Sequence, residues 1–555
     1  MSLPSFSGQA ELFSTAGLSS GIFAETDRYR LFAKLVYPRL AAARSTLENC
    51  YCADNGRVAI EPVVLLGVSI LQELDAMPDR QAVEMLRYHA GWNFALNRQL
   101  GDPVFHPTSL VNFRHRLEEH KQSALAFSMI LSALEEAGLI SRQSRQRLDS
   151  TQMFGRVARM SRLDCVREAL RLGLQELEAL VQPEDRPDSW SGWWERYVES
   201  QADYRASSET LTRKMVDAGT DTRQVLLWLE AQERPEWRQG QQVRLLVRVF
   251  GEEFEVVEGD AAPTPKTVEQ LSSARVQNPH EPEATYAVKG KGEQKKEHVG
   301  YKVQVAETVL EASLAPGEPT RNFIVGMVTH PAYESDETGA LKMEAEQAAM
   351  GLDKPPVQYV DAAYISTQNL VQAQAEGREI IGPAPGAPHK AGRFAVEDFQ
   401  INVEERKAVC PAGKPNTQCS RLQEASTGKV SYRFEFSTQC HDCPLREKCL
   451  GPDQRHRTVV VGEHHSVLQA RRQEQRTDAF KERMKHRNAI EGTQSELVRA
   501  HGLRRARYRG LAKTKLQNYF IGAACNVKRW IRREAWKLQQ AVSLGVTELA
   551  AATAH

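Results

Sequence analysis

The spacing of apolar residues predicts a helical first part of the chain. Between residues 25 and 140, apolar residues such as Leu66 and Ile70 recur every three or four positions. This spacing places them on one face of an α-helix. Residues 1–20 lack the pattern, so we expect no regular structure there. A compact helical N-terminal domain is therefore predicted over residues 21–140.

A second helical stretch follows a short apolar strand. The strand is expected within residues 141–158, and residues 159–265 return to helical spacing with five of the eight tryptophans. Tryptophan at this density is typical of a packed core, so we expect a helical insertion with its own core. An alternative is that some of these rings stack on unpaired bases.

Strand patterns return in the middle of the chain. Residues 299–305 alternate between apolar and polar, and residues 322–328 and 357–361 are short apolar runs. Residues 258–298 are polar and rich in Pro and Lys, so a loop is expected there. The elements predict an α/β core with a mixed sheet over residues 266–385.

Three carboxylates occupy informative places in this pattern. Asp149 lies in the first strand, Asp361 ends a later strand, and Glu491 lies in the middle of a predicted helix. Oxygen ligands of this kind suit a pair of hard divalent cations, which can clamp both oxygens of a phosphoryl displacement. Three unrelated surface acids are the alternative, because Asp is common where strands turn.

Positive charge is concentrated after Glu491, although the net charge of the chain is only +1. Residues 497–533 contain eleven Lys or Arg and no Asp or Glu. Such a block attracts polyanions such as nucleic acid. A solvated helix face is the other interpretation of a charge run.

Two sequence features bear on where the protein is located: membrane-spanning segments and a secretory signal. No stretch is apolar over the roughly 20 residues that a membrane-spanning helix needs. The first residues also lack a basic start followed by an apolar segment, so we expect a cytoplasmic protein. The nine cysteines are then better interpreted as thiols or metal ligands than as disulfides.

Four cysteines are spaced like zinc ligands within an insertion expected over residues 386–462. They are Cys410, Cys440, Cys443 and Cys449. A Cys-x-x-Cys pair with two more cysteines can complete a tetrahedral site for a structural Zn²⁺. Cys419 and His441 are candidate substitutes, and free thiols on a loop are the alternative.

At these residues the sequence resembles the bacterial insertion-sequence DDE transposases, over most of residues 20–535. The matching segments are 148–151 (Leu-Asp-Ser-Thr), 300–302 (Gly-Tyr-Lys), 360–364 (Val-Asp-Ala-Ala-Tyr), Arg487 with Glu491, and 503–513 (Leu-Arg-Arg-Ala-Arg-Tyr-Arg-Gly-Leu-Ala-Lys). Some relatives also have Tyr and Lys where this chain has Met484 and Val498. That departure weakens any strand-handling role taken from those two positions.

The resemblance implies a helical N-terminal domain and a catalytic core that is a ribonuclease H-like mixed sheet with flanking helices and two insertions. In that fold the first and fourth strands are adjacent, which would bring Asp149 beside Asp361. Glu491 would arrive on a helix packed against the same sheet. A catalytic helix and basic C-terminal helices are expected over residues 463–536, and a tail over residues 537–555.

The implied function is a transposase that binds the terminal inverted repeats of its element, cleaves DNA and transfers the 3′-OH end to target DNA. Asp149, Asp361 and Glu491 would be catalytic and would hold two Mg²⁺ or Mn²⁺ ions, with Asp149 bridging both. The implied partners are double-stranded DNA and a second copy of the chain in the DNA complex. Side chains expected to contact DNA are Arg487, Lys302, Arg504, Arg505, Arg507, Tyr508, Arg509, Lys513, Arg114 and Arg116.

Two other functions are compatible with the same residues. A metal-dependent DNA nuclease would hydrolyse DNA without joining it. A transposase-derived regulator would bind DNA without catalysis, although three retained acids count against an inactive site.

Overall fold

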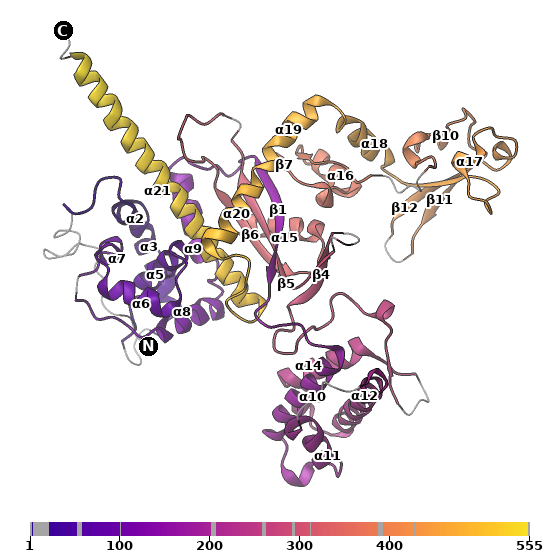
Figure 1. Cartoon of the computed structure of the whole chain (residues 1–555), viewed down its shortest axis with the longest axis horizontal. Coiled ribbons are helices and arrows are strands. Elements are labelled where there is room, and N and C mark those ends of the chain that lie inside the picture. The colour runs from indigo at the N-terminus through magenta and orange to yellow at the C-terminus, as the bar shows by residue number, and fades with distance from the viewer. Residues whose placement is uncertain are drawn as a thin grey trace.

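The computed structural model, shown in Figure 1, contains a central mixed sheet surrounded by helices and two insertions. The structure describes residues 3, 21–52, 58–99, 101–200, 207–257, 262–290, 293, 295–310, 312–386, 392–425 and 428–552, the last nine of these by backbone alone. Residues 1–20, expected to lack regular structure, lie outside the described residues except for Leu3. Among the described helices, none has both the length and the apolar character to cross a membrane.

Helices make up most of the described residues between 28 and 136, as the apolar spacing predicted. They are α2 (Arg28–Leu35), α3 (Tyr37–Ala42), α4 (Arg44–Glu48), α5 (Pro62–Leu74), α6 (Asp79–Tyr88), α7 (Ala90–Ala95), α8 (Thr108–Glu119) and α9 (Leu125–Glu136). Helix α5 is buried along nearly its whole length. The long C-terminal helix α21 (Leu511–Ala552) packs against α5 and α9, so it joins the N-terminal helices to the rest of the chain. This helix also covers most of the segment that we expected as a tail.

The central sheet has β1 (Gln146–Phe154) in its middle. Strand β1 pairs antiparallel with β5 (Lys296–Thr308) and parallel with β7 (Val357–Tyr359). Strand β5 also pairs with β6 (Ile324–Pro331), and β7 pairs with β8 (Glu379–Ile381). The α/β core is thus confirmed, and the first strand lies beside the strand that leads to Asp361.

The expectation of a loop over residues 258–298 was wrong at β4 (Thr285–Lys289). This strand pairs antiparallel with β5 at the edge of the sheet. Only Thr285 is buried in it, and its last two residues are exposed. An edge strand with so little burial needs no apolar alternation, so the pattern that marks strands was absent.

Helices cover both faces of the sheet. A side chain at Gly326 of β6 would meet Met343 of α15 (Asp336–Ala349), while Met327 touches Gly522 of α21. Neighbouring residues of a strand point to opposite faces. Helices α15 and α21 therefore pack on opposite sides of β6, and their apolar residues belong to one continuous core.

A buried ionic network attaches the C-terminal helices to the sheet. Glu307 of β5 accepts hydrogen bonds from Arg147 of β1 and Arg529 of α21, both at 2.5 Å. It also accepts from Thr493 of α20 (Ile490–His501) at 2.7 Å. Arg147 in turn donates to the backbone carbonyl of His486 in α19 (Asp478–Asn488). These contacts determine where α19 and α20 lie relative to β1.

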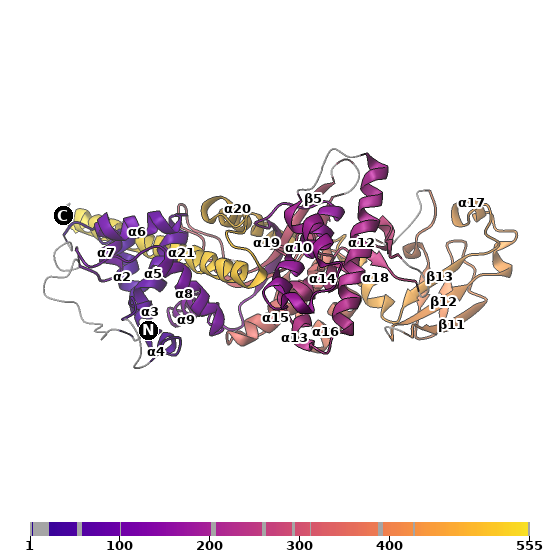
Figure 2. The same cartoon turned by 90° about the horizontal axis from the view of Figure 1, so that it is seen from below.

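The helical insertion has its own core, as predicted. Its helices are α10 (Arg162–Glu178), α11 (Trp190–Trp194), α12 (Ser208–Ala231), α13 (Pro235–Arg238) and α14 (Gln241–Glu253). Trp190, Trp193 and Trp237 are buried in that core, and Trp194 and Trp228 pack against it. The rings are therefore used for packing. Figure 2 shows this insertion as a body separate from the N-terminal helices.

The second insertion is a small β-rich unit between β8 and helix α18 (His465–Glu474). Its elements are β9 (Gln400–Asn402), β10 (Lys407–Val409), β11 (Gln418–Gln423), β12 (Val430–Glu435), α17 (Arg446–Cys449) and β13 (Thr458–Gly462). We refer to residues 392–462 as the small β domain. It lies at the opposite end of the molecule from the N-terminal helices (Figure 1).

Candidate active site

The three predicted acids meet around one guanidinium group. Arg487 Nη2 lies 2.9 Å from Asp149 Oδ2 and 3.9 Å from Asp361 Oδ2. Its Nη1 lies 3.8 Å from Glu491 Oε1. Both aspartate oxygens are measured from the same atom, Arg487 Nη2. The separation between the Asp149 and Asp361 oxygens is therefore no larger than the sum of these two distances. Residues from β1, the end of β7, α19 and α20 are thus gathered at one place.

Asp149 is the most buried of the three, with 12% of its side chain exposed. Its Oδ1 accepts the backbone N–H of Ser150 at 2.8 Å, and its Oδ2 accepts from Arg487. Burial raises the pKa of the Asp149 carboxyl, whereas Arg487 opposes that rise. A buried carboxylate of this kind is stabilised as an anion by any cation that approaches it.

Asp361 lies two residues beyond the end of β7. Its Oδ1 accepts the N–H of Ala363 at 2.8 Å and caps the short 3₁₀ turn Ala362–Tyr364. Its Oδ2 faces Arg487, and 38% of its side chain is exposed. The cap thus fixes one oxygen and leaves the other directed at the site.

Glu491 lies in the first turn of α20, and the expectation that it stands mid-helix was wrong. Helix α19 ends at Asn488, and Ala489 joins the two helices with helical backbone angles and no Gly or Pro. The sequence pattern therefore predicts one continuous helix across α19 and α20. Glu491 is 73% exposed, and a carboxylate in a first helical turn is favoured by the helix dipole.

The donor set fits a hard divalent cation. Three carboxylates offer only oxygen atoms, which Mg²⁺ and Mn²⁺ prefer. A guanidinium already lies among them, so this place attracts positive charge. Exposure rises from Asp149 through Asp361 to Glu491, so the group combines a buried carboxylate with one that solvent reaches.

A polar network behind Asp149 was missed by the sequence reasoning. Lys302 Nζ lies 3.2 Å from Asp336 Oδ1, and Gln304 donates to the same oxygen at 3.1 Å. Tyr364 donates to Gln304, and burial raises the pKa of its hydroxyl, with Asp336 and Asp149 adding to the rise. Asp336 is the first residue of α15, after the helix cap Ser335, and an acid directly after a capping serine could have indicated its position.

The basic segment after Glu491 is attached to the end of β1. Gly502 ends α20 with a φ of +70°, a left-handed conformation that glycine adopts at low cost. Phe154 N–H then donates to the Arg504 carbonyl, and Ala506 N–H donates to the Phe154 carbonyl, both at 2.9 Å. At about 3.3 Å per strand residue, this pairing lies roughly 16 Å along β1 from Asp149.

The side chains expected to contact DNA divide into two groups. Arg504, Arg505, Arg509 and Lys513 are exposed, and of these Arg504 also donates to the Gln152 carbonyl at 2.8 Å. The others are engaged within the protein: Arg114 with Asp79, Arg507 with Glu73, Lys302 with Asp336, Arg487 with the three acids, Tyr508 beneath Arg114, and Arg116 over the Tyr51 ring. Arg114 is also buried, because α8 turns it toward Asp79 and away from solvent.

An open groove lies at the same end of β1. Its lining includes Phe154, Arg156, Arg159, His298 and Arg505, together with one acid, Glu297. Arg156 and Arg159 are exposed and were missed by the sequence reasoning. The Arg-x-x-Arg spacing directly after the first strand could have identified these two arginines as candidates for DNA contact.

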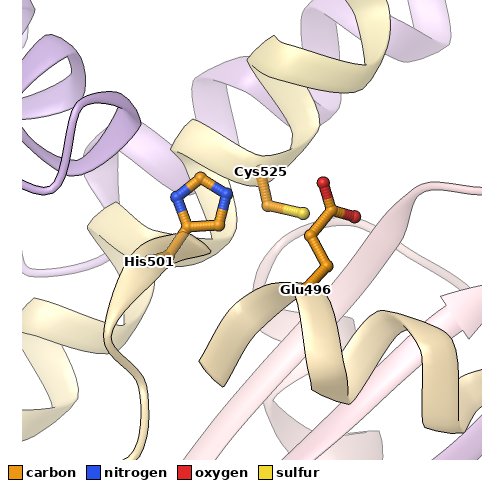
Figure 3. Close-up of side chains that lie close together, drawn as sticks. All are labelled: Glu496, His501 and Cys525. Atoms are coloured by element: carbon orange, nitrogen blue, oxygen red, sulfur yellow. The ribbon is translucent and has the colours of Figure 1, made fainter. Parts of the chain in front are cut away.

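A second group of ligand-type side chains lies elsewhere on α20. Figure 3 shows Glu496, His501 and Cys525 pointing toward one another, and one atom of each lies within 4.8 Å of the others. However, Glu496 already pairs with Lys528 and Arg529, each at 2.9 Å. Burial would raise the pKa of Glu496, but the two cations outweigh it and lower this pKa to about 2. Two adjacent positive charges oppose metal entry, so we interpret the group as a structural contact between α20 and α21.

Two protein-family models match the chain. A transposase DDE domain matches residues 409–531, which contain Arg487 and Glu491 but neither aspartate, and a transposase domain (DUF772) matches residues 20–116. No curated protein matches the chain. Both matches are to transposase families, which confirms the resemblance to the insertion-sequence DDE transposases.

Proposed function

We propose that this chain is a transposase that binds the ends of its element, cleaves DNA phosphodiester bonds and joins the 3′-OH end to target DNA. The convergence of Asp149, Asp361 and Glu491 on Arg487 is the observation that carries the proposal. The family matches support a role in transposition and DNA as the partner.

The proposed catalytic core is a ribonuclease H-like domain. The strand order β6-β5-β1-β7-β8, with β1 parallel to β7 and antiparallel to β5, supports this assignment. It accounts for how Asp149 on β1 and Asp361 just after β7, so distant in the sequence, come together from neighbouring strands in the middle of the sheet.

The proposed cofactors are two Mg²⁺ or Mn²⁺ ions held by the three carboxylates, with Asp149 shared between them. Ions bound there would activate the attacking oxygen and stabilise the leaving oxygen of the phosphodiester. DDE transposases in general use divalent metals, which supports this assignment.

Arg487 has a positioning role in this proposal. It holds carboxylates from three different segments close together and favours the ionised form of the buried Asp149, because its charge opposes the effect of burial on the pKa of that group. With the acid site charge-compensated in another way, the Arg487 guanidinium could instead turn toward a phosphate of bound DNA.

The exposed basic residues provide the proposed DNA path. Arg504 and Arg505 are tied to the end of the strand that carries Asp149, and Arg156 and Arg159 line the groove beside them. Such contacts with phosphates give affinity without sequence preference. End recognition is assigned to the helical N-terminal domain, and synapsis of two ends would require at least a dimer.

A gel assay with labelled element ends tests the proposal and separates it from its alternatives. Nicking followed by joining to a target plasmid in Mg²⁺ is the expected result. Nicking without joining would instead indicate a nuclease, and a mobility shift without cleavage would indicate a DNA-binding regulator.

A further inference from the structure

The small β domain has a core that is small for a unit of its size. Its buried apolar residues, among those the structure describes, are Phe399, Ala408, Phe434, Phe436, Cys440, Cys449, Leu450, Val459 and Val461. Two of these are cysteines. Below roughly 70–80 residues a hydrophobic core rarely supplies more than about 3–5 kcal/mol, and natural domains then add a metal or disulfides.

Four cysteines line one small pocket in this domain. Cys440 and Cys449 are buried, whereas Cys410 and Cys443 are half-buried. All four therefore border the same small space.

Backbone contacts support two of these cysteines as thiolate ligands. Cys410 stands at a tight turn in which its N–H donates to Lys414 and its carbonyl accepts from Gly413, at 2.9 and 2.8 Å. Gly413 has a φ of +73°, which a side chain would disfavour. The sulfur of Cys440 accepts the backbone N–H of Arg457 at 3.5 Å, an interaction that stabilises a thiolate.

The two substitute ligands considered from the sequence lie outside the pocket. Cys419 is in β11, paired with Phe434 of β12, and it does not line the pocket. The side chain of His441 is 86% exposed and lies 2.8 Å from Asp442. The geometry therefore favours the four cysteines over a mixed set.

Some of the four sulfurs stand farther apart than the ligands of a closed zinc site. No three of the four sulfurs lie within 4.8 Å of one another. A tetrahedral zinc site with Zn–S distances of about 2.3 Å would draw them to roughly 3.8 Å. A change of side-chain rotamer at half-buried Cys410 or Cys443 would move its sulfur, and closure of the site would involve such a change.

We propose that Cys410, Cys440, Cys443 and Cys449 bind one Zn²⁺ ion as thiolates in a closed tetrahedral site. Four protein ligands leave no open coordination position, so the ion is structural and not catalytic. It links the turn after β10 to the segment around α17 and adds the stabilisation that the small core lacks. The ligands must lose protons to bind, so zinc affinity falls as the pH decreases.

The effect of the ion is expected to be local. Glu397 of the small β domain lies 3.3 Å from Arg472 of α18 and 3.2 Å from Arg476 in the turn after that helix. Its apolar core is separate from that of the sheet. Loss of zinc should therefore loosen residues 392–462 and leave the acid site assembled.

The metal content of the purified full-length protein tests the site. We expect about one zinc per chain in the wild type, loss of at least 80–90% of it (roughly tenfold) in Cys443→Ser, and full retention in Cys419→Ser, a cysteine of the same domain outside the pocket. Asp149→Asn should also retain zinc, which separates this site from the proposed catalytic one. A wild-type protein without zinc after expression in zinc-supplemented medium, or full zinc in Cys443→Ser, would overturn the proposal.

A second measurement covers the case in which Cys443→Ser does not fold. Chelation of the wild-type protein should expose residues 392–462 to limited proteolysis, and added Zn²⁺ should restore protection. Cobalt added to the stripped protein should give the strong near-ultraviolet charge-transfer absorption of a tetrathiolate site. Unchanged proteolysis after complete zinc removal, or cobalt without thiolate bands, would contradict the assignment.

Discussion

Helix α20 carries ligand-type side chains at two places that differ in their electrostatic balance. Glu491 joins Asp149 and Asp361, and these three carboxylates share one arginine. Five residues further along, roughly 140° around the helix, Glu496 faces His501 and Cys525. There, Lys528 and Arg529 already neutralise it.

The difference teaches which cluster can accept a metal ion. The first group has an excess of negative charge and one ligand that is 73% exposed. The second belongs to a buried network in which Arg147, Lys528 and Arg529 outnumber Glu307 and Glu496. Proximity of donor atoms is thus insufficient, and uncompensated charge with access from solvent distinguishes the candidate active site.

The largest expected effect is a loss of stability when the buried ionic network around Glu307 is disrupted. Arg529→Met should lower the free energy of unfolding by about 3–5 kcal/mol, because it leaves Glu307 buried with a weakened charge partnership. Chemical denaturation measures this change. The exposed Arg532 on the same helix is the control, and Arg532→Met should stay within about 0.5 kcal/mol of the wild type. Equal effects of the two substitutions would contradict a structural role for the network.

Glu491→Gln, in contrast to Arg529→Met, should reduce catalytic activity and leave stability nearly unchanged. Cleavage of labelled ends should fall by at least about 10²–10³-fold, the scale of removing one electrostatic stabiliser, whereas stability should hardly change because the side chain is exposed. Glu482→Gln removes the same charge from an exposed position on α19 and should cleave normally. Retained cleavage in Glu491→Gln would remove this residue from the active site.

The basic segment should show a smaller effect that depends on salt. Replacing Arg504 and Arg505 with Ala should weaken DNA binding and reduce the slope of log affinity against log salt by about one for each phosphate that these side chains neutralise. Replacing Arg114 should leave that slope unchanged, since its guanidinium is buried against Asp79. Identical slopes for the wild type and the double variant would argue against phosphate binding by Arg504 and Arg505.

The smallest expected effect is a dependence of protein stability on pH through Glu496. The pKa of Glu496 is lowered from 4.5 to about 2 in the folded protein, so its ionised form stabilises the fold fully above pH 4.5. This contribution is lost as the pH falls from 4.5 towards 2. The stability difference between the wild type and Glu496→Gln should therefore shrink over that range in denaturation experiments. A constant difference would mean that Glu496 is not held as an anion by Lys528 and Arg529.

The sequence was informative where local pattern determines structure. Alternation and apolar runs identified β1, β5, β6 and β7, and the fold implied by the family resemblance placed Asp149 near Asp361. Patterns did not reveal the break before Glu491, because Ala489 continues the helical angles without a Gly or Pro.

Long-range contacts explain the remaining differences. Arg114 belongs to a basic helix, yet pairing with Asp79 buries it. Asp336 and Tyr364 join the surroundings of Asp149 only through the packing of α15 and the turn after β7. Such partners depend on tertiary structure and leave no spacing signal in the chain.

The most direct test of the central claim is the anomalous scattering of manganese in crystals of the protein soaked with Mn²⁺. The account predicts peaks among Asp149, Asp361 and Glu491, with two ions about 4 Å apart and Arg487 displaced from the carboxylates. An empty acid site at saturating Mn²⁺, or manganese bound only at Glu496, His501 and Cys525, would contradict it.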